Sequence, residues 1–183
     1  LKYFKEEYNN MDNKIKTSIL ATATSFLNQF QEYRASKVFC PESEARTITT
    51  IDKIIDNGEI LLFDIESPSL ARSMGTILKL HYQQSVLRRV TDKKRGKEIP
   101  SFLICDEYQD VVSSGAGVTF GDDDFLAKSR QSNSVSIVAT QSLSSIYNAI
   151  SSEKAAKELI QNFRTRICFH SADIETIKNM QDL

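Results

Sequence analysis

Cysteine is scarce in this 183-residue chain, and its three cysteines, Cys40, Cys105 and Cys168, include no Cys-x-x-Cys pair. An odd, scattered set argues against a disulfide framework or a zinc site and indicates a reducing compartment. No apolar run approaches the ~20 residues that cross a bilayer, and no signal peptide is visible. Charge of either sign is not in excess, because 23 Lys+Arg against 24 Asp+Glu give a formal net charge of −1. Bulk electrostatics therefore predict neither nucleic-acid nor membrane binding, and any DNA contact must come from a local patch.

A phosphate-binding loop is also missing. No G-x-x-x-x-G-K-[ST] motif occurs anywhere in the sequence. The glycine-rich stretch from Tyr108 to Gly121 lacks the Lys-Ser/Thr pair that such a loop needs, so we expect a flexible loop there.

What the sequence does contain is an apolar run that ends abruptly in two acids. Phe102 to Cys105 follow Pro100 and stop at Asp106 and Glu107, a pattern typical of a strand buried on both faces. In open α/β sheets ligands sit at the carboxyl ends of such strands. An acid pair there is the Walker B arrangement, in which the first acid holds Mg²⁺ and the second orients or deprotonates the attacking water. Taken alone the pattern is weak, and it favours a buried strand that ends in solvated acids over a Walker B site.

The remaining chain reads as alternating helices and strands from Gly58 onward, which predicts a mainly parallel α/β sheet. Before it, an apolar stripe from Ile15 to Tyr33 predicts a helix that packs, with a partner-binding helix as the alternative. We expect a short helix over Leu1–Tyr8, a connector over Ser36–Thr47, and two parts, 1–47 and 48–183. The other expected elements are a helix over Thr50–Asn57 started by Thr49, strand Glu59–Ile65, a helix from Ser67-Pro68 to Val90, strand Val135–Thr140, helices Leu143–Ile150 and Glu153–Gln161, strand Phe163–Phe169, and a helix from Asp173.

Two charged clusters leave alternatives open. Asp122, Asp123 and Asp124 open a helix, where acids offset the helix dipole, although they could also bind a metal. Six basic residues crowd a helix end and the loop after it. They favour either an exposed basic loop or contact with a DNA backbone: Arg88, Arg89, Lys93, Lys94, Arg95 and Lys97.

The predicted sheet brings two polar strand ends together. Asp106-Glu107 and Thr140-Gln141 each follow a strand, and parallel neighbours end at the same edge. A carboxylate pair beside a glutamine can position a water against a γ-phosphate, with Gln141 sensing whether that phosphate is present.

In this order, the segments F-L-I-C-D-E-Y-Q, F-L-A-K-S-R-Q, S-I-V-A-T-Q-S-L-S-S-I and N-F-R-T-R-I-C-F-H-S-A-D-I-E-T resemble the second half of a HerA/FtsK-superfamily motor. They are most similar to type IV secretion coupling proteins of the conjugative TraG/TraD kind. The resemblance covers the chain from about Thr49 onward, and the first third looks like the tail of that family's all-α domain. It implies a RecA-like P-loop NTPase fold that is partial here, because the P-loop strand is absent.

The resemblance also implies roles for individual residues. Asp106 would hold Mg²⁺ through water, Glu107 would act on the attacking water, and Gln141 would be the sensor for ATP. Arg130 matches an arginine often found ahead of the sensor strand and is expected to face a neighbouring subunit's nucleotide.

The implied whole is a larger machine. We expect the chain to be the C-terminal part of an ATP-driven DNA translocase whose intact form binds ATP and Mg²⁺. Its partners would be DNA, the other subunits of a homo-hexamer, and relaxosome or secretion-channel proteins. It would work at the cytoplasmic face of the bacterial inner membrane, anchored through a segment absent here. Another HerA/FtsK-type translocase and a non-catalytic docking module for secretion or relaxosome components are the alternatives.

Overall fold

The computed structural model describes residues 2–31, 36, 50–64, 70–92, 99–114, 120–150 and 152–182. The chain divides into two compact units, Leu1–Ile48 and Thr49–Leu183, one residue away from the division expected at 47/48. Each unit is described by itself.

The first unit is helical. It contains α1 (Lys2–Glu6), η1 (Tyr8–Asn10), α2 (Asn13–Asn28) and η2 (Gln29–Gln31). The apolar stripe predicted to pack is not buried, because α2 has no buried residue and Leu20 and Leu27 are 56% and 57% exposed. The packing prediction is therefore wrong for the described part of this stripe. A periodic stripe specifies a helix face, but only a neighbouring element can bury it.

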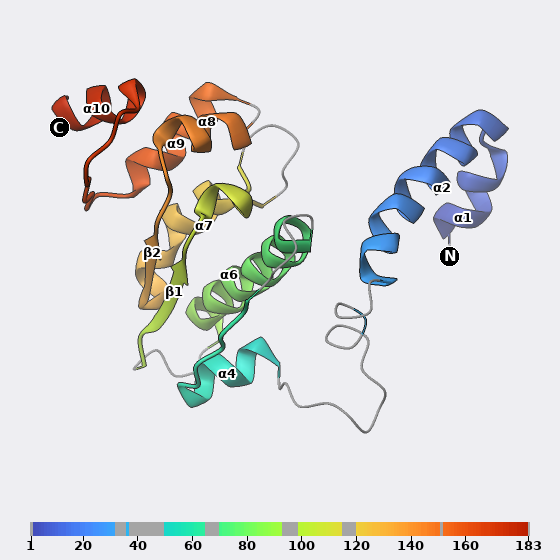
Figure 1. The fold of residues 1–183 in the computed structure, drawn as a ribbon. Helices are drawn as coiled ribbons and strands as arrows, with labels where there is room; N and C mark the ends of the chain where they lie inside the picture. Colours follow the sequence, from blue (N-terminus) through green and yellow to red (C-terminus); the bar gives the residue numbers. More distant parts are fainter. Residues whose placement is uncertain are drawn as a thin grey trace. The chain divides into compact units, whose positions relative to one another are not determined.

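The second unit is a mixed α/β structure that is mostly helical (Figure 1). Its elements are α4 (Ile51–Asn57), the π-helix η3 (Ala71–Gly75), α6 (Thr76–Thr91), β1 (Ser101–Cys105), η4 (Tyr108–Asp110), α7 (Asp122–Ser129), η5 (Arg130–Ser132), β2 (Ser134–Val138), α8 (Leu143–Ala149), α9 (Glu153–Asn162) and α10 (Ile174–Gln181). No helix in the described ranges combines the length and apolar character needed to cross a membrane.

The sheet is smaller than predicted. Within the described residues it has two strands, β1 and β2, which pair in parallel from Ser101↔Ser134 to Cys105↔Val138. The expected strands Glu59–Ile65 and Phe163–Phe169 do not join it: residues 59–64 and 163–169 form neither helix nor strand, and Ile65 lies outside the described residues. An apolar β-prone run becomes a strand only when a neighbouring strand accepts its backbone hydrogen bonds, so these two predictions are wrong.

Capping residues predicted the ends of helices more accurately than apolar runs predicted strands. Thr50 caps α4 by accepting a hydrogen bond from the Lys53 amide, and Gly58 ends that helix in the left-handed conformation at φ 68°. The cap is therefore Thr50, one residue after the predicted Thr49, which lies outside the described residues. Serine or aspartate side chains cap three later helices, as Ser142, Ser152 and Asp173.

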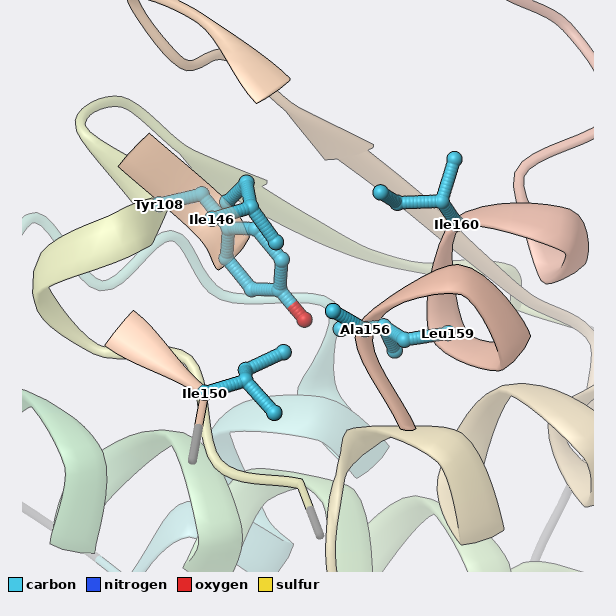
Figure 2. Packing of buried hydrophobic residues seen from close by; sticks show 6 residues of the cluster. All are labelled: Tyr108, Ile146, Ile150, Ala156, Leu159 and Ile160. Carbon is cyan, nitrogen blue, oxygen red and sulfur yellow. The ribbon is translucent and has the colours of Figure 1, made fainter. Parts of the chain in front are cut away.

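Two apolar clusters hold the second unit together. One joins α4, α6 and α7 through Ile51, Ile54, Ile55, Val86 and Phe125. The other surrounds the ring of Tyr108 with residues of α8 and α9, as Figure 2 shows. Tyr108 is only 3% exposed and directly follows Glu107, so this second cluster fixes the backbone at the acid-ended strand.

One face of the sheet stays bare among the described residues. Phe102 and Ile104 of β1 pair with Val135 and Ile137 of β2, and these four side chains are 54%, 75%, 41% and 52% exposed. The alternate side chains, such as Cys105 and Val138, pack against the Tyr108 cluster instead. A parallel sheet is normally covered on both faces. The prediction that the strand ending at Asp106 is buried on both faces is therefore wrong, because one face of β1 is exposed among the described residues.

Candidate functional site: the carboxyl ends of the parallel strands

Glu107 stands at the end of β1 in an unusual backbone conformation. Its φ and ψ are 50° and 48°, and it is one of two non-glycine residues with positive φ in the described chain. Such a conformation costs of order 1–3 kcal/mol and persists only where surrounding contacts enforce it, which is common at functional sites. Two contacts do so here. Asp106 Oδ1 accepts the Glu107 amide at 3.0 Å, and the Tyr108 amide donates to Ala139 O at 2.9 Å.

The Glu107 carboxylate joins the ends of both strands. Gln141, just beyond β2, donates from Nε2 to Glu107 Oε1 at 3.0 Å, and Gln109 donates to Glu107 Oε2. Thr140 Oγ1 donates to Gln109 Oε1 at 2.7 Å and closes the group. The prediction that Glu107 and Gln141 emerge side by side from neighbouring parallel strands is thus met. We call Glu107, Gln109, Thr140 and Gln141 the strand-end network.

Hydrogen bonding favours the ionised form of the Glu107 carboxyl group. The amides of Gln141 and, second, Gln109 hold the pKa of Glu107 below its ordinary value, because they stabilise the ionised form. Glu107 is exposed, so water can reach it. A general base works best with a pKa near the working pH, so a lowered pKa favours orienting a water molecule over removing its proton.

Two other predicted site residues, Asp106 and Arg130, do not belong to the strand-end network. Asp106 is exposed, with its carboxylate bonded to the Glu107 amide. Mg²⁺ keeps most of its waters and can bind through one carboxylate, so a single water-mediated contact at Asp106 fits that ion. The described residues contain no cluster of three or more His, Cys, Asp or Glu that could hold a metal directly. Arg130 begins η5 and precedes the amino end of β2, whereas Gln141 follows its carboxyl end. The five residues of β2 between them span about 17 Å.

The basic cluster proves to be partly structural. Arg89 is only 1% exposed and donates to Ile99 O at 2.7 Å. Arg88 pairs with Asp52 at 3.2 Å across α6 and α4. Lys93, Lys94, Arg95 and Lys97 lie outside the described residues, so DNA contact there stays a prediction.

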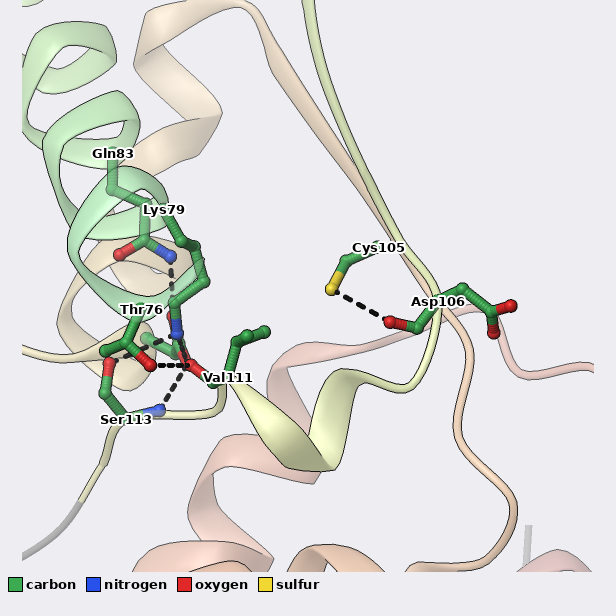
Figure 3. A network of polar contacts seen from close by, with 8 residues as sticks. Thr76, Lys79, Gln83, Cys105, Asp106, Val111 and Ser113 are labelled. Carbon is green, nitrogen blue, oxygen red and sulfur yellow. Dashed lines mark hydrogen bonds and ion pairs between the residues drawn. The ribbon is translucent and has the colours of Figure 1, made fainter. Parts of the chain in front are cut away.

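Sequence reasoning missed a buried charged group on α6. Lys79 Nζ and Asp122 Oδ2 lie 2.5 Å apart, with side chains 4% and 1% exposed. Asp122 also accepts Gln83 Nε2 at 2.6 Å and the Ser113 amide at 2.8 Å, and Lys79 donates to Ser113 Oγ at 3.2 Å (Figure 3). Burial lowers the pKa of Lys79 although Asp122 opposes the shift. We call Lys79, Gln83, Ser113 and Asp122 the loop clamp.

The loop clamp corrects the interpretation of Asp122 and Gly121. Asp122 is in the first turn of α7, as predicted, but its carboxylate binds a lysine from another helix rather than capping α7. Gly121 is required by space, because a Cβ there would lie 2.6 Å from Ser113 O. The clamp therefore ties residues 111–114, which follow the strand-end network, to α6 and α7. The only signal in the sequence was a lysine and a glutamine four residues apart within the predicted helix that ends at Val90.

The chain matches no protein-family model, no curated protein and no solved structure.

Proposed function

We propose that this chain carries the Walker B and sensor elements of a RecA-like, ATP-driven DNA translocase of the conjugation or type IV secretion coupling class. The observation that supports it is the 3.0 Å hydrogen bond from Gln141 to Glu107 across the ends of two neighbouring parallel strands. An acid and an amide held together there can bind and orient a water molecule.

Glu107 and Gln141 of the strand-end network, together with Asp106 and Arg130, each have a task in this proposal. Glu107 orients the attacking water, and Gln141 detects the γ-phosphate by exchanging its bond to Glu107 for one to the phosphate. Asp106 holds Mg²⁺ through water. Mg²⁺, when bound, neutralises charge that develops on the phosphates. Arg130, at the far end of β2, is left free to meet a nucleotide on the neighbouring subunit of a hexameric ring around DNA.

A docking module remains the second candidate. It is favoured by the exposed apolar stripe of α2, where Leu20 and Leu27 are more than half exposed and the helix buries no residue. Exposed apolar stripes of this kind bind partner helices or grooves. In that case the partners would be secretion or relaxosome components, and the acids after β1 would serve only structure.

One substitution separates the two functions. In the intact protein, Glu107→Gln is expected to abolish DNA-stimulated ATP hydrolysis while ATP binding is kept, because the amide cannot orient water as a carboxylate does. The matched control is Glu158→Gln, an exposed glutamate on α9, which should leave hydrolysis unchanged. Phosphate release and nucleotide binding are measured on both variants. Full hydrolysis by the Glu107→Gln protein would favour the docking module.

A further inference from the structure

The outer edge of β2 is open. The Ser101 amide donates to Asn133 O at 3.1 Å, and the Ala139 amide donates to Cys105 O at 2.9 Å. With the register Ser101↔Ser134, these bonds show that odd-numbered residues of β2 turn their backbone groups toward β1. The amides and carbonyls of the even-numbered residues Ser134, Ser136 and Val138 point to the opposite edge, where the described chain places no third strand.

A large cleft runs beside this edge. Its volume is about 1230 Å³, and it is lined by residues 134–142 on one side and by the non-helical segment 163–170 on the other. Small-molecule pockets usually measure ~300–1,000 Å³, so this cleft exceeds that range and has room for a polypeptide segment. An unpaired strand edge offers a polypeptide the backbone hydrogen bonds that a small ligand does not use.

The side chains around the cleft specify the chemistry of an occupant. Segment 163–170 presents Ile167 and Phe169, which are 80% and 87% exposed, so apolar contacts are available. The charged side chains that line the cleft are basic, and no aspartate or glutamate is among them. They are Arg130, Arg164 and Arg166. The guanidinium of Arg166 already donates to Phe163 O, Asn179 Oδ1 and Ile160 O, so Arg130 and Arg164 are the two that can meet an occupant.

We propose that this cleft binds an extended segment of a partner polypeptide, which adds to the outer edge of β2 as a third strand. The segment carries apolar residues that contact Ile167 and Phe169, and carboxylates that pair with Arg130 and Arg164. β2 leads directly into Thr140 and Gln141. A segment bound parallel to β2 therefore ends beside the strand-end network, but its binding does not depend on the proposed ATPase.

Amide hydrogen exchange of the 183-residue chain tests the open edge. Without a partner, the amides of Ser134, Ser136 and Val138 should exchange fast, while those of Val135 and Ile137 are protected by β1. Adding a short, end-capped peptide of alternating glutamate and valine should slow the three outward amides by roughly tenfold or more. Outward amides that are already protected in a self-associated chain would overturn the proposal, since a second copy would then fill the cleft.

Two modified peptides test how the segment is recognised. N-methylation of the alternate peptide amides that face β2 should abolish binding, because those donors are lost while the side chains remain. Replacing each glutamate by lysine should also abolish it, because the cleft has no acids. Equal binding of either peptide, seen as the same slowing of exchange, would contradict the proposed strand addition or its charge preference.

Variants of the chain complete the test. Ser136→Pro removes an outward amide and keeps the bonds to β1, so peptide binding should be lost while Val135 and Ile137 stay protected. Arg164→Glu should weaken the glutamate peptide and admit the lysine peptide. Lys154→Glu, an exposed position on α9 that does not line the cleft, is the matched control and should change neither result. Unchanged peptide preference in Arg164→Glu, which leaves the backbone edge intact, would overturn the assignment.

Discussion

At the scale of single residues, the structure concentrates strain and polarity on Glu107. Its left-handed backbone, the cap from Asp106 and the two glutamine donors act on one exposed carboxylate. Tyr108, the next residue, is buried among α8 and α9 and prevents the backbone from relaxing. The side chain is therefore held in place while its oxygens remain open to water, the combination that positioning a nucleophile requires.

The first prediction concerns the pKa of Glu107. Gln141→Leu removes the donor that contributes most to the lowered pKa, so the pKa should rise toward its ordinary value of about 4.3. A titration followed by NMR of side-chain carboxyl carbons measures the shift. Gln161→Leu, an exposed position on α9, should leave the pKa of Glu107 unchanged.

The same bond has a pH-dependent effect on stability. Because the folded pKa is lower than the unfolded one, the hydrogen bonds stabilise the folded state above about pH 4.3 and lose that effect as pH falls through the folded pKa. The difference in melting temperature between the native chain and Gln141→Leu should therefore vanish in acid. A difference that persists at low pH would contradict this role of Gln141.

At the scale of elements, the loop clamp joins α6, α7 and the loop after η4. One buried aspartate serves a lysine, a glutamine and a backbone amide at once, so three segments depend on one side chain. Thr76 adds a bond to Val111 O at 3.4 Å from the same helix. The chain leaves β1 at Glu107 and reaches residues 111–114 after η4. The clamp holds residues 111–114 against α6 and α7.

The clamp gives a prediction for stability. Asp122→Asn leaves the buried Lys79 charge without a counter-ion, so the free energy of unfolding should fall by about 3–5 kcal/mol. Asp124→Asn is the control on the same helix, because its ion pair with Lys128 is exposed and should contribute less than about 1 kcal/mol. Urea unfolding of both variants measures the difference. Equal, small losses would show that the buried pair does not form in solution.

At the scale of the whole molecule, the second unit has polar strand ends joined by a hydrogen bond and, among its described residues, a sheet of only two strands. The edge of β2 and the apolar face formed by Phe102, Ile104, Val135 and Ile137 are open in the described residues. The sequence contains no G-x-x-x-x-G-K-[ST] to bind phosphates.

We therefore expect the 183-residue chain by itself to bind ATP poorly and to hydrolyse almost none. Phosphate release in the presence of Mg²⁺ and DNA should stay at the level of the Glu107→Gln variant, measured side by side. Steady turnover that Glu107→Gln abolishes would show that the chain supplies its own phosphate-binding groups.

Much of the local structure could be predicted from residues that act over a few positions. Gly58 ends α4, Ser142 and Asp173 begin α8 and α10, and the apolar runs before Asp106 and Thr140 form strands. Even the contact between Glu107 and Gln141 followed from local signals, because two parallel neighbours must end at one edge. RecA-like architecture, in contrast, needs more strands than the two described here, and it stays a proposal.

Local residues were enough to predict the ends of several helices, the strands β1 and β2, and the polar residues that follow those strands, because caps and apolar periods act within a few residues. Only the tertiary structure decided which apolar surfaces are buried. The stripe of α2 was predicted to pack, yet α2 buries no residue. Strands were predicted over residues 59–64 and 163–169, yet neither segment forms a strand. It also decided that Lys79 meets Asp122, since partners 43 residues apart leave no local pattern. The periodicity of a segment describes its own surface, but the burial of a helix face and the pairing of a strand also need a neighbouring element.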